Sequence, residues 1–350
     1  MRNEELKKGK SRLGDILKMV VFLGIGVFFI YWFLLKLEPE QKAAIWQSFR
    51  EANYLWVAVA MAVCLLSHFV RALRWRLLFL PLGYKPHIGN IFGSVVVAYL
   101  ANLAFPRAGE VVRCATLRTS EEIPLEKSLG TVVTERLIDT LAFAIVILIG
   151  MLVMFGKAKD WLYDILSEKF DNLPNMAVIA GVLVALVVVA FLAYKLLWKR
   201  LLHIAFFKKI DDMVRGMIDG VKSIFHMGGR RTALFIAYSV VIYLLYILGG
   251  LIIFQAFDET GWLGMRAAFV VYLFGTVGMT FSQGGIGVYP VLVQVALDIY
   301  GISMEVGTAC GWLLWGSQQA VVIAVGAAFL VYFSLKKREK KTAPATPNSH

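Results

Sequence analysis

The sequence predicts an all-α polytopic membrane protein with about six spanning helices and two re-entrant helical hairpins, arranged as two halves of inverted topology. The composition is the first reason: 59% of residues are hydrophobic and 17% are charged, whereas about a quarter are charged in an ordinary soluble domain. The second is that several apolar runs reach the ~18–20 residues that a bilayer crossing needs. The third is the placement of the basic residues, which decides which runs can cross.

Hydropathy alone gives eight apolar segments. They lie at about 16–36, 55–75, 88–105, 128–156, 175–197, 232–257, 266–281 and 303–334. The first follows a basic N-terminus (1–15) and no small-residue cleavage site comes after it, so we expect an uncleaved spanning helix rather than a signal peptide.

The net charge is +12. Lys and Arg lie mostly between the apolar runs, which favours topogenic charge on the cytoplasmic side over nucleic-acid binding, and we expect no nucleic-acid partner. By this rule four regions should be cytoplasmic. They are the N-terminus, a loop with Arg71, Arg74, Arg76 and Lys85, the basic segment 195–231 and the tail from Lys336 to Lys341.

Eight simple crossings from a cytoplasmic N-terminus would put segment 195–231 outside. The conflict disappears if 88–118 enters from the cytoplasm and returns to it, and if 266–300 enters from the outside and returns there. The limb after the first tip, roughly Glu110 to Thr119, is about 15 Å long as a helix and reaches halfway across a core of about 30 Å. Eight crossings with a poor charge bias are the alternative.

This layout gives one transmembrane domain, 16–335, whose halves are 16–156 and 175–335. Between them, 201–226 has apolar and charged residues on opposite faces of a helix, which indicates an amphipathic helix at the cytoplasmic interface. A lateral gate or a docking helix is the alternative for this segment. We expect 336–350 to be a disordered cytoplasmic tail.

The two hairpin tips hold the candidate lipid-headgroup site. In the first tip Pro106 and Gly109 interrupt the helix, and a helix restarting near Glu110 has free N–H groups that favour an anion. Arg107 beside such an N-terminus is typical of a phosphate site. The second tip is uncharged but lets the backbone approach a ligand closely, with a simple hinge as the alternative; its residues are Ser282, Gln283, Gly284, Gly285 and Gly287.

A network of charges surrounds the first tip, although charged groups in a bilayer cost several kcal/mol unless they are paired or wet. Arg113 follows the tip, and Glu135, Arg136 and Asp139 lie on the next helix at i, i+3 and i, i+4 spacing. Two interpretations stay open, a structural ion-pair network and a polar cavity that offers arginines to an anionic headgroup. The same cavity could be lined by Trp312, Trp315, Gln318 and Gln319.

The sequence has no motif that indicates a metal site, a cofactor site or a catalytic site. Cys64, Cys114 and Cys310 lack CxxC spacing and the five histidines form no HxxxH pair, so we expect no metal and no cofactor. There is no nucleophile with a base, no P-loop and no GxSxG motif. We therefore expect no catalytic residues and no enzyme.

The stretch NLAFPRAGEVVRCATLRTSEEIPLEKSLGTVVTERLIDTL (102–141) resembles the signature of the lysylphosphatidylglycerol synthase transmembrane family, also called flippase-like domain proteins. That signature is roughly N-x-x-x-P-x-R-x-G-E-x-x-R followed by E-R-x-x-D, and GGIGVYP (284–290) resembles the second family motif. The resemblance covers about 15–335. It implies lipid translocation rather than aminoacyl transfer, because nothing here is similar to the C-terminal aminoacyl-transfer domain of the bifunctional members.

Two positions depart from the family pattern. Arg107 follows Pro106 directly, and Pro290 stands where members often have an acidic residue. The function we expect is movement of an anionic phospholipid or a polyprenyl-phosphate-type lipid across the cytoplasmic membrane, with both termini cytoplasmic. The alternatives are a membrane enzyme on lipid-linked donors, using Glu135 and Asp139, and a non-transporting scaffold or regulator.

Overall fold

The computed structural model describes residues 39–105, 108–169 and 228–342, and within these ranges every regular element is a helix. The chain divides into two compact units, one formed by 1–132 with 229–350 and the other by 133–228. Helix α6 begins in the first unit and continues into the second. The description below concerns the first unit unless it names α6.

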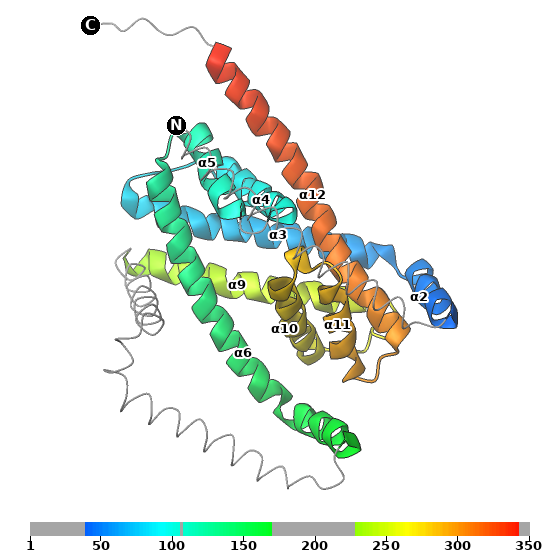
Figure 1. The fold of residues 1–350 in the computed structure, drawn as a ribbon. Helices are drawn as coiled ribbons and strands as arrows, with labels where there is room; N and C mark the ends of the chain where they lie inside the picture. Colours follow the sequence, from blue (N-terminus) through cyan, green and yellow to red (C-terminus); the bar gives the residue numbers. More distant parts are fainter. Residues whose placement is uncertain (1–38, 106–107, 170–227, 343–350) are drawn as a thin grey trace, which may run out of the picture. The chain divides into compact units, whose positions relative to one another are not determined.

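The helices follow one another in this order (Figure 1): α2 (Pro39–Glu51), α3 (Tyr54–Phe79), the 3-10 turn η1 (Leu80–Leu82), α4 (Ile88–Ala104), α5 (Gly109–Glu121), α6 (Leu125–Lys169), α9 (Gly229–Phe254), α10 (Met265–Phe281), the 3-10 turn η2 (Gln283–Gly285), α11 (Val288–Asp298) and α12 (Met304–Thr342). Within the described residues three stretches are long and apolar enough to cross a membrane, namely Tyr54–Leu82, Gly229–Phe254 and Met304–Lys336. The all-α polytopic class is thereby confirmed. The predicted helices at 16–36, 175–197 and 201–226 lie outside the described residues.

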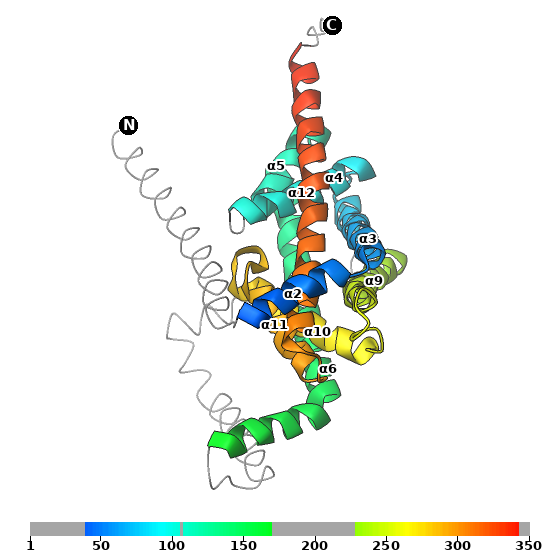
Figure 2. The ribbon, with the colours of Figure 1, turned by 90° about the vertical axis from the view of Figure 1, so that its right-hand side faces the viewer.

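Helices α3 and α9 form an antiparallel pair, seen side by side in Figures 1 and 2. Asn53 caps α3, since its side-chain oxygen accepts from the Leu55 amide at 3.1 Å, and its own amide donates to the Ala256 carbonyl at 2.9 Å. The first residue of α3 therefore lies beside the end of α9. At the other end of the pair are η1 and the N-terminus of α9.

Helices α4 and α5 form the first hairpin, which opens at the η1 end. Arg76 near the end of α3 donates to the Pro86 carbonyl at 3.1 Å. The Glu121 carboxylate at the end of α5 accepts from the His87 amide at 3.2 Å and from the Asn90 side chain, which ties the two limbs together at their base. With 17 and 13 residues, the limbs are about 26 Å and 20 Å long, both short of a core of about 30 Å.

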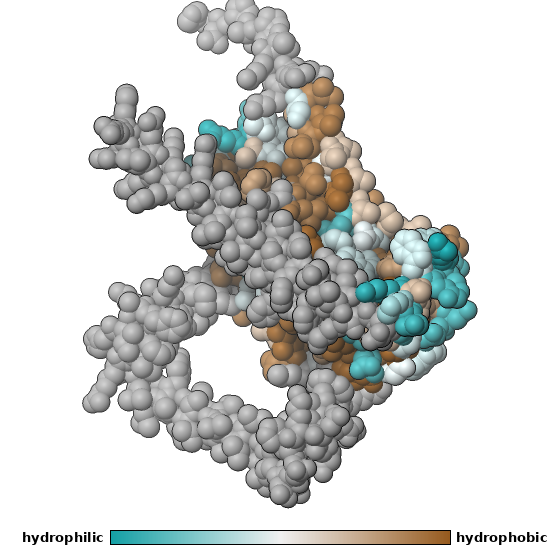
Figure 3. Space-filling view, turned by 45° about the vertical axis from the view of Figure 1, so that its right-hand side comes forward, coloured by the Kyte–Doolittle hydropathy of each residue, from teal (hydrophilic) through white to brown (hydrophobic). Residues whose placement is uncertain are grey.

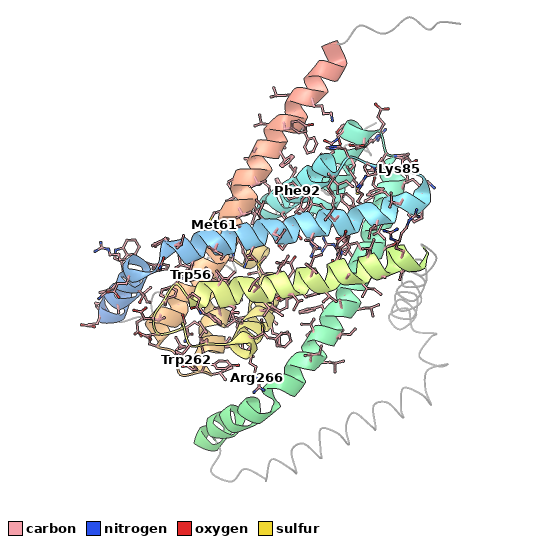
Figure 4. The ribbon with its side chains drawn as sticks, turned by 180° about the vertical axis from the view of Figure 1, so that it is seen from behind. Trp56, Met61, Lys85, Phe92, Trp262 and Arg266 are labelled. Atoms are coloured by element: carbon pink, nitrogen blue, oxygen red, sulfur yellow. The ribbon has the colours of Figure 1, made fainter. Side chains whose placement is uncertain are left out.

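Helices α10 and α11 form the second hairpin, which opens at the opposite end, beside Asn53 and Ala256. Its base is connected to the α9–α10 loop because the Ser303 hydroxyl donates to the Glu259 carboxylate at 2.9 Å. With 17 and 11 residues, its limbs are about 26 Å and 17 Å long. Figure 4 shows the two ends, with Lys85 at one and with Trp56, Trp262 and Arg266 at the other.

Helix α12 packs against both hairpins at different levels along its length (Figure 2). Near its start, Gly311 allows close contact with the backbone of Pro290 in α11; farther along, Gly326 faces Leu100 in α4. Its outer side is apolar, with Ile323, Leu330, Val331 and Leu335 exposed, and Figure 3 shows a hydrophobic surface there and a hydrophilic one around α2. The helix continues to Thr342, beyond position 336 where we expected a disordered tail to begin.

The predicted basic loop is wrong for three of its four members. Arg71, Arg74 and Arg76 all lie within α3, and only Lys85 is in a loop. Arg71 and Arg74 are buried within the helix because Tyr246 and Ser239 accept hydrogen bonds from them, and the helix continues to Phe79.

Candidate functional site

The tips of the two hairpins meet. Gly284 in the second tip adopts φ +61°, and a Cβ at that position would lie 3.0 Å from Cδ2 of Leu103, near the end of α4. The Gly284 carbonyl accepts a hydrogen bond of 2.7 Å from the indole N–H of Trp315 in α12. Two segments separated by some 180 positions in the sequence are therefore in contact next to one aromatic side chain.

The first tip is closed by a hydrogen bond between its two limbs. The Asn102 side-chain oxygen accepts from the Gly109 amide at 2.7 Å. Gly109 is the first residue of α5 and is buried, and a Cβ there would collide with the Ala98 carbonyl and lie 2.7 Å from the Asn102 amide nitrogen. Glycine is thus required for the close approach of α5 to α4. Pro106 and Arg107 lie outside the described residues, so their proposed role stays a prediction.

The second tip is built from backbone rather than from side-chain ligands. Ser282 is buried and its hydroxyl donates to the Gly278 carbonyl of its own helix at 2.9 Å. Gly285 and Gly287 are buried with φ of +79° and +74°, a region that glycine adopts without strain. The Gln283 side chain lies outside the described part. Behind the tip, Gln318 lies 3.4 Å from the Tyr289 hydroxyl.

Arg113 is the predicted site residue with the clearest environment. It is 2% exposed, and its guanidinium carbon lies 4.4 Å from the centre of the Trp75 ring in α3. Trp75 is fully buried and donates from its indole nitrogen to the Thr131 hydroxyl at 3.0 Å. A desolvated cation over a tryptophan face is stabilised by about 2 kcal/mol. The residue that follows the first tip is therefore held in place by α3.

Sequence reasoning missed a row of buried polar side chains on α3. His68, Arg71 and Arg74 are 6%, 8% and 1% exposed. Arg71 donates to the Tyr246 hydroxyl at 3.0 Å and Arg74 donates to the Ser239 hydroxyl at 3.1 Å, both in α9. The signal was present in HFVRALRWR (68–76): His68, Arg71 and Trp75 recur at helical spacing, so they share one face.

The acidic candidates divide between the two units. Glu110 is half-buried in α5. On α6, Glu135 is fully buried, Asp139 is half-buried and Arg136 is exposed, so the helix turns its two carboxylates and its arginine toward different surroundings. Ion pairing between these α6 residues and the arginines of the hairpin stays a prediction, since Glu135, Arg136 and Asp139 belong to the other unit.

The described helices bury three arginines, Arg71, Arg74 and Arg113, whose guanidinium groups carry positive charge into the bundle. Within the described ranges no group of three His, Cys, Asp or Glu side chains is placed to hold a metal ion. The hydrogen-bond donors buried near the hairpins are guanidinium, imidazole, hydroxyl and indole groups, and the half-buried Glu110 adds a carboxylate beside the first tip. Donors and positive charge in an apolar bundle suit an oxyanion.

Two helical hairpins that open at opposite ends of an apolar bundle and meet at their tips define a polytopic membrane protein with broken helices, a design known from secondary transporters. The profile of the family described as "Lysylphosphatidylglycerol synthase TM region" matches residues 16–327. The chain belongs to this family.

Two curated relatives match part of the chain. One is Glycosyltransferase AglD of Haloferax volcanii, 26% identical over 151 residues, which are 42% of this chain and 24% of that protein. The other is a UPF0104 membrane protein of Methanocaldococcus jannaschii, 30% identical over 156 residues, 43% of this chain and 44% of that protein. The chain spans less than half the length of each relative. No solved structure matches it.

Proposed function

We propose that this protein moves a lipid with an anionic headgroup, a phospholipid or a polyprenyl-phosphate-type lipid, across the membrane. The observation that carries the proposal is the contact between the two hairpin tips, Leu103 against Gly284, next to helices that bury guanidinium groups. Helix ends and irregular backbone at membrane depth are tolerated where they are buried in protein or line a water-filled path. Burying an arginine in such a place costs free energy unless its guanidinium interacts with a substrate or a structural partner.

The headgroup would pass beside the tips while the lipid tails stay in the bilayer. On the first tip the N-terminal end of α5 and the buried Arg113 supply positive potential, although the Gly109 amide already donates to Asn102. On the second tip Gly285 and Gly287 are buried and Gly284 is half-buried, so the headgroup would meet the backbone at Gly284. Membrane lipids are thus the proposed partners.

We also propose that the end of the bundle at η1 faces the cytoplasm. Among the described residues, basic side chains predominate at that end and acidic ones at the other. The first group comprises Arg76, Lys85, Arg118, Lys127, Arg230, Arg231 and Lys336, and the second Glu40, Glu51, Asp258, Glu259, Asp298 and Glu305. Exposed Trp46, Trp56 and Trp262 mark the acidic end as an interface. The end of α12 would then lie on the cytoplasmic side, and so would the N-terminus if 16–36 crosses the membrane as predicted.

Reconstitution tests the proposal. Liposomes containing the purified protein and fluorescent phosphatidylglycerol are treated with dithionite, which bleaches only the outer leaflet. We expect bleaching to go beyond the outer leaflet with the wild-type protein and to slow with Arg113→Gln, because the buried charge is lost. Arg118→Gln, on the exposed side of the same helix, is the matched control. Wild-type liposomes that bleach no further than protein-free ones would exclude transport.

A second candidate is a membrane enzyme that handles lipid-linked sugars. The match to a protein named as a glycosyltransferase, over 42% of this chain, favours it. Turnover of a polyprenyl-phosphate sugar in detergent micelles, where no second compartment exists, separates this candidate from transport. Loss of that turnover in Asp139→Asn would be expected if the α6 carboxylates supply the acid or base.

A further inference from the structure

The row of buried residues on α3 continues into a cluster of aromatic rings from three other helices. The His68 ring lies 4.6 Å from the ring of Tyr99 in α4, and the Arg71 guanidinium lies 6.0 Å from the same ring. Tyr246 of α9, which accepts from Arg71, stacks on Tyr272 of α10 at 5.9 Å. Residues from α3, α4, α9 and α10 therefore converge around one guanidinium and one imidazole.

The His68 ring in this cluster has one nitrogen without a hydrogen-bond partner. His68 is 6% exposed, and its Nδ1 is unsatisfied within the described part of the chain. The other ring nitrogen, Nε2, lies 3.7 Å from the Cys64 thiol, one helical turn earlier. If the thiol donates to Nε2, the tautomer that carries its proton on Nδ1 is favoured. In that tautomer Nδ1 carries a buried N–H without an acceptor, which costs free energy and which an oxyanion would satisfy.

The helices that line the cluster provide positive charge without a carboxylate. The sequences of α3, α4, α9 and α10 contain no Asp or Glu between their first and last residues. The Tyr246 hydroxyl accepts from Arg71, so any further hydrogen bond that its proton makes is one it donates. Guanidinium, imidazole N–H and phenol O–H together are the donor set of an oxyanion site, and the surrounding rings exclude water and strengthen each contact.

We propose that His68, Arg71 and Tyr246 form a binding site for a phosphoryl oxyanion, separate from the hairpin tips. The site binds the phosphate through the guanidinium of Arg71, Nδ1 of His68 and the Tyr246 hydroxyl, with the Tyr99 ring as one wall. The phosphate comes either from a lipid headgroup or from free phosphate. Only the first of these sources rests on the proposed transport function. In transport, this would be the place where a headgroup rests between the two sides.

Equilibrium binding to the full-length protein in detergent tests the site without transport. The probes are phosphatidylglycerol and diacylglycerol with the same fluorescent acyl chain, and inorganic phosphate serves as competitor. We expect phosphatidylglycerol to bind more tightly than diacylglycerol, and His68→Phe and Arg71→Gln to weaken it about tenfold, the effect of one charge-assisted hydrogen bond. Arg76→Gln, on the same helix but bonded to a loop carbonyl, should bind as the wild type does.

A matched pair of variants tests whether Nδ1 of His68 is the ring nitrogen that binds the phosphate. Asn at position 68 can place its amide N–H near the position of Nδ1, whereas Gln reaches the position of Nε2. His68→Asn should therefore retain phosphatidylglycerol binding and His68→Gln should lose it, with equal thermal unfolding of both showing that the fold is intact. The opposite order, or equal binding of both lipids by every variant, would overturn the proposal.

These binding experiments also test the phosphate site independently of the proposed transport function. Competition by millimolar inorganic phosphate that disappears in His68→Phe assigns the site to free phosphate as well as to lipid; absence of competition with lipid binding intact assigns it to the headgroup alone. If the protein binds phosphatidylglycerol through His68 but moves no lipid in liposomes, the proposed binding site stands and the proposed transport function is refuted.

Discussion

Replacing Gly109 with Ala tests the close approach of the two limbs of the first hairpin. The new methyl group would collide with the Ala98 carbonyl and lie 2.7 Å and 2.8 Å from Nδ2 and Cγ of Asn102. One of these neighbours is backbone and cannot rotate away. The side chain of Asn102 can move only by giving up its 2.7 Å hydrogen bond from the Gly109 amide.

The magnitude follows from three terms. Overpacking costs about 1–3 kcal/mol, and loss of the hydrogen bond adds about 0.5–1.5 kcal/mol. Alanine is a better helix former than glycine by about 0.5–1 kcal/mol, which offsets part of the cost. We expect the free energy of unfolding to fall by about 1–3 kcal/mol, measured by denaturant unfolding of the full chain in detergent micelles.

Gly130→Ala is the control. Gly130 is an exposed residue of α6, and a Cβ there would meet no atom within 4 Å. That substitution should leave stability unchanged or raise it by up to about 1 kcal/mol through helix propensity. Equal unfolding midpoints for the two variants would refute the reasoning, since both replace a helical glycine and only the contact at Gly109 distinguishes them.

Three further predictions concern the aromatic support, the tip contact and the sidedness. Trp75→Phe should lower the free energy of unfolding by about 1 kcal/mol, because the hydrogen bond to Thr131 is lost. Trp75→Leu should lower it by about 2 kcal/mol more, because the ring under Arg113 is also lost. Equal losses for the two variants would show that the ring face contributes nothing. Gly284→Ala should destabilise more than Gly83→Ala, because both adopt positive φ but only Gly284 has Leu103 at 3.0 Å; the same melting temperature for both would mean that the tips do not touch. In a chain whose own cysteines are replaced by Ala, Lys85→Cys should react with a membrane-impermeant maleimide from the cytoplasmic side only and Trp262→Cys from the other side only; labelling of both from one side would contradict the proposed orientation.

The two hairpins could be predicted from the sequence because the placement of basic residues along the chain excluded eight simple crossings. Pro106 with Gly109, and the glycines at 284–287, then marked where each hairpin turns, because these residues interrupt a helix. The predicted limbs 88–118 and 266–300 match α4 with α5 and α10 with α11 within a few residues. Glycine at 109 was also recognisable as a helix breaker, although the contact that requires it was not.

The basic residues of α3 show where local signals fail. The positive-inside rule treats a run of arginines as a loop because an unpaired charge is expensive in lipid. Arg71 and Arg74 escape that cost by donating to Tyr246 and Ser239, which lie more than 160 positions away in the sequence. No pattern in 68–76 names those partners.

The sequence by itself determined the class of protein, the place of the hairpins and the identity of the tip residues, since hydropathy and backbone freedom are properties of neighbouring residues. Only the tertiary structure decided that Leu103 meets Gly284, that Trp75 supports Arg113 and that His68 stands beside Arg71 with an unsatisfied nitrogen. These contacts join helices far apart in the chain, and their free energies depend on distances of a few ångströms that appear only when the helices pack.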